Sequence, residues 1–224
     1  MPTRIYLVRH GATELTAEDR FAGSTDVPLS EQGRNQVRAL AARLRCDSLD
    51  AVFASPMGRT METARIIAES HGLEPTQEPG LREIDYGHWE GLTREQVAAD
   101  FAEEYSAWQE DPLTSAPKGG ESGIDVLARA LPVMRRIVHD HHDRSVLVVA
   151  HKGTNRLLVS SLLGFDARGY RDRLDQSPAG LTILDFASEV RARLRLFNDI
   201  SHYEGLPARE LEQRLSHWWS DPCH

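Results

Sequence analysis

A chain of 224 residues is long enough for one substantial hydrophobic core, and nothing in this length requires a second domain. A net charge of −8 with no basic stripe argues against a nucleic-acid partner, so a small anionic ligand needs a local cationic pocket. We see no signal peptide, no membrane span, and only Cys46 and Cys223 as cysteines, so we expect a reduced, cytoplasmic protein without a membrane partner.

The first predicted element is a strand from Arg4 to Val8. Its β-branched and aromatic residues favour extended backbone, and the scarcity of polar side chains suits a strand covered on both faces. It ends in Arg9, His10 and Gly11, at the sheet edge where open α/β folds bind ligands. An imidazole beside a guanidinium and a residue without a side chain suits the acceptance of a phosphoryl group.

A polar loop is predicted over residues 13–25, followed by a helix that Ser30 caps. A second strand, 52–54, runs into Ser55 and Pro56, which we expect as the N-cap and first residue of another helix. Arg59 then lies in the first turn, near free backbone N–H groups. Stripes at helical spacing predict packing of both helices on the sheet: Val37, Leu40, Ala41 and Leu44 in the first, Met61, Ala64, Ile67 and Ala68 in the second.

The middle of the chain is irregular from Leu81 to Gly91, where glycines alternate with ionisable residues that include Glu83. Thr93 and Gln96 form a capping-box pattern, which predicts a helix that continues to about residue 108. Residues 111–123 are rich in Pro, Gly, Ser and Thr and predict a loop, and residues 121–141 predict a long helix.

The third predicted buried strand, 145–150, ends in His151, and residues 153–155 open the next helix. His151 therefore lies at the positive end of that helix. Residues 181–186 and 191–197 predict two closing strands, the last a half-exposed edge. In the tail, Leu211, Leu215 and Trp218 recur at helical spacing, so the tail docks either on its own domain or on a second copy, as in a homodimer.

Two histidines at strand ends, an arginine at a helix start and an isolated carboxylate together predict a phosphate pocket with its own proton donor. The histidine-rich run 139–143 is the alternative site, for a metal. However, consecutive ligands do not converge on one ion, and histidine is favourable at the end of a helix. We therefore expect no metal.

In combination, these motifs resemble the histidine phosphatase superfamily, also called the phosphoglycerate mutase-like family, over about residues 3–190. The resemblance rests on residues 9–11, the helix entry 26–33, the segment 55–64, the segment 83–91 and His151. It implies a three-layer α/β/α sandwich around a doubly wound, mostly parallel sheet with an antiparallel edge strand. We expect this domain to span residues 1–200 and a C-terminal helical tail to span residues 201–224.

By that resemblance, His10 is the nucleophile that becomes phosphorylated and Glu83 is the proton donor. Arg9, Arg59 and His151 form the phosphate clamp. Read from the residues alone, Glu83 has rivals in three nearby carboxylates, which are Glu14, Asp85 and Glu90.

The substrate side of the expected pocket departs from the family pattern. The family usually carries Asn where Thr16 stands and Gln where Ala22 stands. The residues expected on this side are Gly11, Thr16, Ala22, Gly23, His88 and Lys152.

The function predicted from these features is hydrolysis of a small phosphorylated metabolite by a phosphomonoesterase that uses a phosphohistidine and no cofactor. Phosphoserine, sugar phosphates and a ribazole phosphate are all open as substrates. A 2,3-bisphosphoglycerate-dependent mutase is the alternative, but glycolytic mutases carry Arg-His-Tyr-Gly where this chain has residues 84–87, and a longer interval before the second histidine. A non-catalytic phospholigand or protein-binding module predicts a lost nucleophile or clamp, and the sequence retains both.

Overall fold

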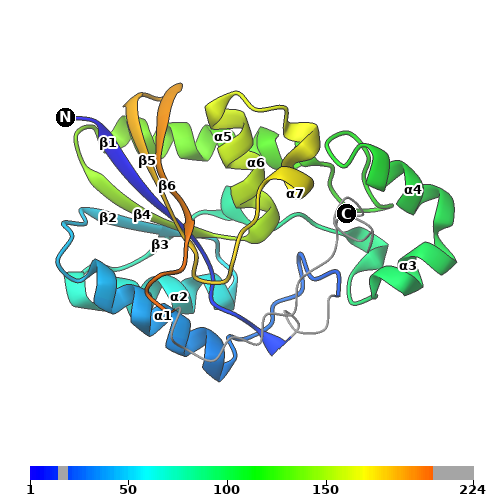
Figure 1. The fold of residues 1–224 in the computed structure, drawn as a ribbon, viewed down its shortest axis with the longest axis horizontal. Coiled ribbons are helices and arrows are strands. Elements are labelled where there is room, and N and C mark those ends of the chain that lie inside the picture. The colour runs from blue at the N-terminus through cyan, green and yellow to red at the C-terminus, as the bar shows by residue number, and fades with distance from the viewer. Residues whose placement is uncertain (15–19, 204–224) are drawn as a thin grey trace.

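The computed structural model describes residues 1–14 and 20–203, so Thr16 and all but the first three residues of the predicted C-terminal tail lie outside the described residues. One six-stranded sheet forms its centre, in the order β3 (Thr76–Gln77), β2 (Ala51–Ala54), β4 (Ser145–Ala150), β1 (Thr3–Arg9), β5 (Leu181–Ser188) and β6 (Arg191–Asp199). Helices α1 (Glu31–Leu44) and α2 (Gly58–Ala68) cover one face, and α5 (Gly123–Asp140) and α6 (Lys152–Leu163) cover the other (Figure 1). The predicted α/β/α fold class is confirmed.

The parallel part of the sheet brings the two predicted histidines together. Its strands are β1 (Thr3–Arg9), β2 (Ala51–Ala54), β3 (Thr76–Gln77) and β4 (Ser145–Ala150). In the β1–β4 register, Arg9 pairs with Ala150, and the His10 backbone N–H donates to the Ala150 carbonyl at 3.1 Å. Because both strands end at the same edge, His10 and His151 follow side by side.

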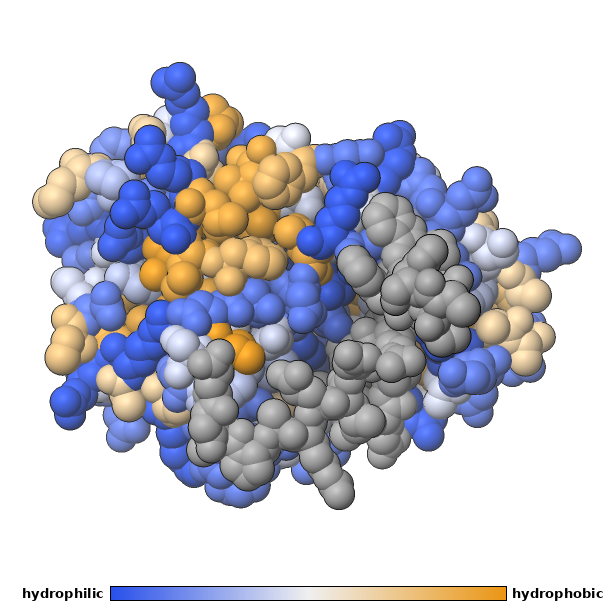
Figure 2. All heavy atoms as spheres, viewed as in Figure 1, coloured by the Kyte–Doolittle hydropathy of each residue, from blue (hydrophilic) through white to orange (hydrophobic). Residues whose placement is uncertain are grey.

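The antiparallel edge is a hairpin of β5 (Leu181–Ser188) and β6 (Arg191–Asp199), close to the predicted strand bounds. Strand β6 alternates exposed arginines, such as Arg193 and Arg195, with half-buried apolar residues. Figure 2 shows apolar surface in the region of β5 and β6, because the apolar side chains of this edge hairpin are only half-buried.

Alternate residues of the central strands enter two separate cores. On one face Val8 and Val149 contact residues of α1 (Glu31–Leu44) and α2 (Gly58–Ala68). On the other face Leu7 and Val148 contact residues of α5 (Gly123–Asp140) and α6 (Lys152–Leu163). This two-sided burial is the reason for the strands' continuous hydrophobicity.

Helix starts follow local signals in most places. Ser30 accepts a hydrogen bond from the Gly33 N–H at the start of α1, and Thr93 makes a full capping box with Gln96. A second capping box joins Ser122 to Asp125, so α5 begins two residues after the predicted start. Shorter elements within residues 1–14 and 20–203 include α7 (Tyr170–Arg173) and the 3₁₀ helices Glu69–His71, Pro79–Leu81, Gly87–Trp89 and Ala167–Gly169.

The helix expected from residue 94 to residue 108 is wrong in one respect, because it breaks into α3 (Arg94–Asp100) and α4 (Ala102–Glu110). Phe101 leaves helical geometry at φ −134° and ψ 43°, and its ring lies 4.3 Å from that of His88. The bend lets α4 join a buried aromatic cluster of Phe21, Trp89, Tyr105 and Trp108. No helix within residues 1–14 and 20–203 is both long and apolar enough to span a bilayer.

Candidate active site

His10 follows β1 directly and is buried against His151, with ring centroids 5.2 Å apart in an edge-on arrangement. Its Nδ1 lies 2.7 Å from the Gly11 carbonyl oxygen. Since a carbonyl can only accept, the proton belongs on Nδ1 and the lone pair is on Nε2. Burial lowers the pKa of His10 well below its usual value, and the charges of Arg59 and Arg9 lower it further.

Gly11 allows this strand end to pack against the first turn of α1. A Cβ at this position would lie 2.6 Å from the Gly33 carbonyl oxygen, which no side chain tolerates. The Gly11 N–H also donates to the Thr63 hydroxyl of α2 at 3.2 Å. The backbone that carries His10 is therefore fixed by both helices on this face of the sheet.

His151 is fully buried at the N-cap of α6, and its Nε2 lies 2.8 Å from the Ser55 hydroxyl. Its Nδ1 is buried and has no hydrogen-bond partner in the described part of the chain. Burial lowers the pKa of His151 well below its usual value, with Arg59 and His10 contributing. This Nδ1 can donate a hydrogen bond to an anion in the tautomer that carries the proton there.

The predicted role of Ser55 as a helix N-cap is wrong. Helix α2 begins at Gly58 with Met57 at the N-cap and no side-chain cap. The Ser55 hydroxyl contacts His151 instead, so a contact across the sheet edge replaces the local one. Arg59 still lies in the first turn of α2, as predicted.

Two buried guanidinium groups, those of Arg9 and Arg59, lie near the histidines, with 5% and 3% of their surface exposed. Arg9 Nη1 donates to the Gln176 carbonyl at 2.6 Å, and its Nε is buried without a partner among the described residues. Burial lowers the pKa of Arg9 to about 10 and also lowers that of Arg59. Both groups therefore stay positive at neutral pH.

Arg59 also holds the loop that follows β1. Its Nη1 donates to the Thr25 carbonyl at 2.7 Å and its Nη2 to the Gly23 carbonyl at 3.0 Å. A longer ion pair of 3.7 Å joins Arg59 to the half-exposed carboxylate of Asp26. This loop is consequently tied to one of the two buried cations.

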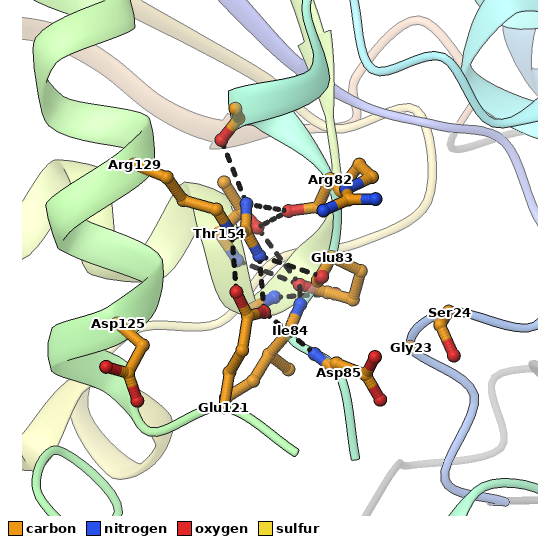
Figure 3. Close-up of polar contacts among 12 residues, drawn as sticks. Gly23, Ser24, Arg82, Glu83, Ile84, Asp85, Glu121, Asp125, Arg129 and Thr154 are labelled. Carbon is orange, nitrogen blue, oxygen red and sulfur yellow. Dashed lines mark hydrogen bonds and ion pairs between the residues drawn. The ribbon is translucent and has the colours of Figure 1, made fainter. Parts of the chain in front are cut away.

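The Glu83 carboxylate is held at the start of α6, directly after His151. Its Oε2 accepts the Gly153 N–H at 2.9 Å, and its Oε1 accepts the Thr154 N–H at 3.0 Å. The Ile84 N–H and the Thr154 hydroxyl reach the same Oε1 at 3.0 and 3.2 Å (Figure 3). The topology thus brings this carboxylate to the edge where both histidines lie.

Glu90, a rival for the acid role, is committed to holding the loop instead. Its Oε1 accepts the backbone N–H groups of Gly23, Ser24 and Tyr86 at 2.9–3.1 Å. Its Oε2 accepts the Thr25 hydroxyl at 2.8 Å. Glu90 therefore holds N–H groups of the same loop whose carbonyls Arg59 holds.

The other two rivals lie in different settings. Asp85 uses Oδ1 to accept the Gly87 N–H at 2.8 Å, and Glu14 is exposed. Of the four carboxylates, Glu83 is the one held by the backbone N–H groups of Gly153 and Thr154, two and three residues after His151.

A family model of the histidine phosphatase superfamily (branch 1) matches residues 5–200. The chain belongs to this superfamily. It is 36% identical over 163 residues to phosphoserine phosphatase 1 of Hydrogenobacter thermophilus, covering 73% of this chain and 77% of that one. Glucosyl-3-phosphoglycerate phosphatase of Mycobacterium tuberculosis is 38% identical over 168 residues, covering 71% and 75%.

Among solved structures, YhfR of Bacillus stearothermophilus superposes with a TM-score of 0.84 at 31% identity, covering 90% of this chain and all of that one. The predicted resemblance to the superfamily is therefore confirmed, and the named curated relatives are phosphatases.

In this histidine phosphatase superfamily member, Gly23 touches the segment that carries Glu83, since a Cβ would lie 1.8 Å from the Ile84 carbonyl oxygen. Ala22 is half-buried beside it, and Lys152 is the half-buried first residue of α6. His88 lies with its Nε2 2.6 Å from a Glu104 carboxylate oxygen of α4. The roles expected for these residues stay predictions.

Sequence reasoning missed Arg129 of α5, whose guanidinium fixes the segment around Glu83. Nη1 donates to the Gly80 and Arg82 carbonyls at 2.9 and 2.8 Å, and Nη2 donates to the Glu83 carbonyl at 2.9 Å (Figure 3). Nε and Nη2 also form a bidentate pair with Glu121 at 2.8 and 2.7 Å. No sequence signal points to this role, because backbone carbonyl acceptors leave no pattern in the residues.

Proposed function

We propose that this protein is a phosphomonoesterase that hydrolyses a small phosphorylated metabolite through a phosphohistidine on His10. One observation carries the proposal: His10, with its lone pair on Nε2, is buried among the charges of Arg9 and Arg59. Such cations stabilise the negative charge that spreads over the equatorial oxygens during phosphoryl transfer.

In the first step, His10 Nε2 attacks phosphorus and the bond from phosphorus to the ester oxygen breaks. The leaving oxygen takes a proton from Glu83, which must be protonated to give it. His151, with its Nδ1 unpartnered in the described chain, completes the clamp together with both guanidinium groups.

In the second step, water attacks the phosphohistidine while the Glu83 carboxylate accepts a proton from it. The bond from nitrogen to phosphorus breaks, and inorganic phosphate leaves. His10 and Glu83 return to their starting states. The two guanidinium groups supply the positive charge for both steps, so we propose a reaction that needs no metal ion.

The relatives support a small metabolite as the substrate. Their names specify phosphoserine and glucosyl-3-phosphoglycerate, both of which are phosphate esters. A 2,3-bisphosphoglycerate-dependent mutase is the alternative outcome, and it differs in passing the phosphoryl group to a second sugar-acid oxygen rather than to water.

The test is phosphate release by the purified protein from a panel of phosphorylated sugars, glycerates and amino acids, together with His10→Ala. We expect turnover by the wild type, no turnover by H10A, and a base-stable, acid-labile label on the protein after a quench with ³²P-substrate. Absence of that label under turnover would overturn the phosphohistidine. With 3-phosphoglycerate and 2,3-bisphosphoglycerate, formation of 2-phosphoglycerate instead of phosphate would indicate the mutase.

A further inference from the structure

A cavity of about 200 Å³ lies directly beside the Glu83 carboxylate. Its lining includes Ser24, Arg82, Glu83, Asp85 and Glu121. If Glu83 protonates the leaving oxygen, as the proposed function has it, the leaving group occupies this cavity. The side chains that line it then read the chemistry of that group.

Arg82 brings an uncommitted positive charge to this cavity. Its backbone carbonyl is held by Arg129 Nη1 at 2.8 Å and by the Thr154 hydroxyl at 2.7 Å. Its side chain is exposed and makes no hydrogen bond or ion pair with another residue in the described ranges, although its charge acts on Glu121 at longer range. A rigid backbone thus carries a guanidinium that is available for a ligand.

Asp85 brings an available negative charge to the same cavity. Its backbone is fixed to Glu121, with its N–H donating at 3.1 Å and its carbonyl accepting at 2.8 Å. One carboxylate oxygen accepts the Gly87 N–H, and the other accepts nothing within the described chain. Figure 3 shows the Asp85 and Arg82 side chains extending to the side of Gly23 and Ser24, away from Arg129.

Glu121 does not add a free charge to this pair, because it forms the bidentate ion pair with Arg129. The cavity therefore presents one available cation, Arg82, and one available anion, Asp85, which precede and follow the proposed acid Glu83 in the sequence. A purely anionic leaving group would meet the Asp85 carboxylate, and a neutral one would desolvate both charges without compensation. A leaving group that carries both signs pairs with each.

Building on the proposed function, we propose that the substrate is an α-amino acid, a small zwitterion, that carries the phosphate ester on its side-chain hydroxyl. Its carboxylate pairs with Arg82, whose planar guanidinium matches carboxylate geometry. Its ammonium pairs with the free oxygen of Asp85. Arg82 and Asp85 are then the specificity-determining residues of this site, and the phosphate clamp is common to any ester.

Four esters that differ in one charge at a time test this assignment. O-phosphoserine carries both groups, 3-phosphooxypropanoate only the carboxylate, phosphoethanolamine only the ammonium, and ethyl phosphate neither. We expect kcat/KM to rise by about tenfold or more for each charge added, the effect of one charge-assisted hydrogen bond. Arg82→Gln should lower kcat/KM about tenfold only for the esters with a carboxylate, O-phosphoserine and 3-phosphooxypropanoate. Asp85→Asn should lower kcat/KM about tenfold only for the esters with an ammonium group, O-phosphoserine and phosphoethanolamine.

The variants are chosen to keep the fold. Asn at position 85 retains the oxygen that accepts the Gly87 N–H, and the Arg82 carbonyl bonds do not involve its side chain. Arg135→Gln and Asp140→Asn make the same charge changes at exposed positions of α5 outside the cavity, and should change no ratio among the four esters.

Turnover of p-nitrophenyl phosphate separates the two proposals. If this ester is hydrolysed but the four esters react alike, or if R82Q lowers all four equally, the zwitterion assignment is overturned and the phosphomonoesterase stands. If no ester at all is hydrolysed, both are overturned.

Discussion

Arg129 donates a hydrogen bond from Nη2 to the backbone carbonyl of Glu83 at 2.9 Å, although 46 positions separate the two residues in the chain. The same guanidinium holds the carbonyls of Gly80 and Arg82, so helix α5 sets the position of the whole segment. Arg129 acts on Glu83 through its backbone. It is a positioning residue, and the proposed chemistry passes through the carboxylate that it places.

Arg129→Lys should therefore lower kcat more than it changes KM. A lysine ammonium has three donors and no planar fork, so it cannot hold three carbonyls and both oxygens of Glu121 together. A displacement of about 1 Å at a catalytic group can cost up to about 100-fold in rate. We expect a loss of about tenfold or more in kcat, measured by steady-state kinetics. The melting temperature of the variant is measured in parallel, and full kcat with a lowered melting temperature would make Arg129 merely structural.

Glu83→Gln tests proton donation through the leaving group. An alkyl ester needs a proton on its departing oxygen, and general acid catalysis contributes about 10²–10⁴-fold. A p-nitrophenolate leaves without that help. Because kcat/KM reports the first step and not the hydrolysis of the phosphohistidine, kcat/KM should fall far more for the alkyl ester than for p-nitrophenyl phosphate. Equal losses of kcat/KM on both esters would show that Glu83 does not protonate the leaving oxygen. Glu90→Gln, which loosens the loop around Gly23, is the matched control and should affect both esters alike.

Much of this site follows from local sequence signals. Buried strands that end in histidine predicted where His10 and His151 lie, because parallel strands of one sheet share their carboxyl edge. Ser30 and Thr93 predicted helix starts, since a cap involves only residues three positions apart.

The features that sequence reasoning missed depend on distant contacts. Ser55 has the local signature of a cap, yet its hydroxyl contacts His151, 96 positions away. At the break between α3 and α4, the Phe101 ring packs on that of His88, a contact that no helical periodicity encodes. Arg129 resembles any polar residue on an amphipathic helix. In each case a tertiary partner decides between two locally acceptable arrangements.

The buried histidines predict a pH dependence of stability. Burial lowers the pKa of both His10 and His151 well below 6.5 in the folded protein. Below about pH 6.5 the unfolded chain binds protons that the folded chain does not, so unfolding becomes easier as pH falls. Each such group contributes a slope of up to about 1.4 kcal/mol per pH unit.

Urea denaturation at pH 7.5, 6.0 and 5.0 measures this slope. His10→Asn should reduce it by one group, whereas substitution of the exposed His142 by Gln should leave it unchanged. An unchanged slope in H10N would show that this imidazole takes up its proton in the folded state as readily as in the unfolded one.

Ser55→Ala tests the contact that replaced the predicted helix cap. The hydroxyl lies 2.8 Å from His151 Nε2 and fixes the orientation of a ring whose Nδ1 has no partner in the described chain. Removal of this hydroxyl frees the ring to rotate and leaves a buried nitrogen unsatisfied, at a cost of about 1–3 kcal/mol. We expect a weaker clamp, seen as weaker competitive inhibition by inorganic phosphate and a lower kcat/KM for every ester, whatever its leaving group. Ser55→Thr keeps a hydroxyl and should retain more of both. Normal phosphate inhibition in S55A would mean that packing alone orients His151.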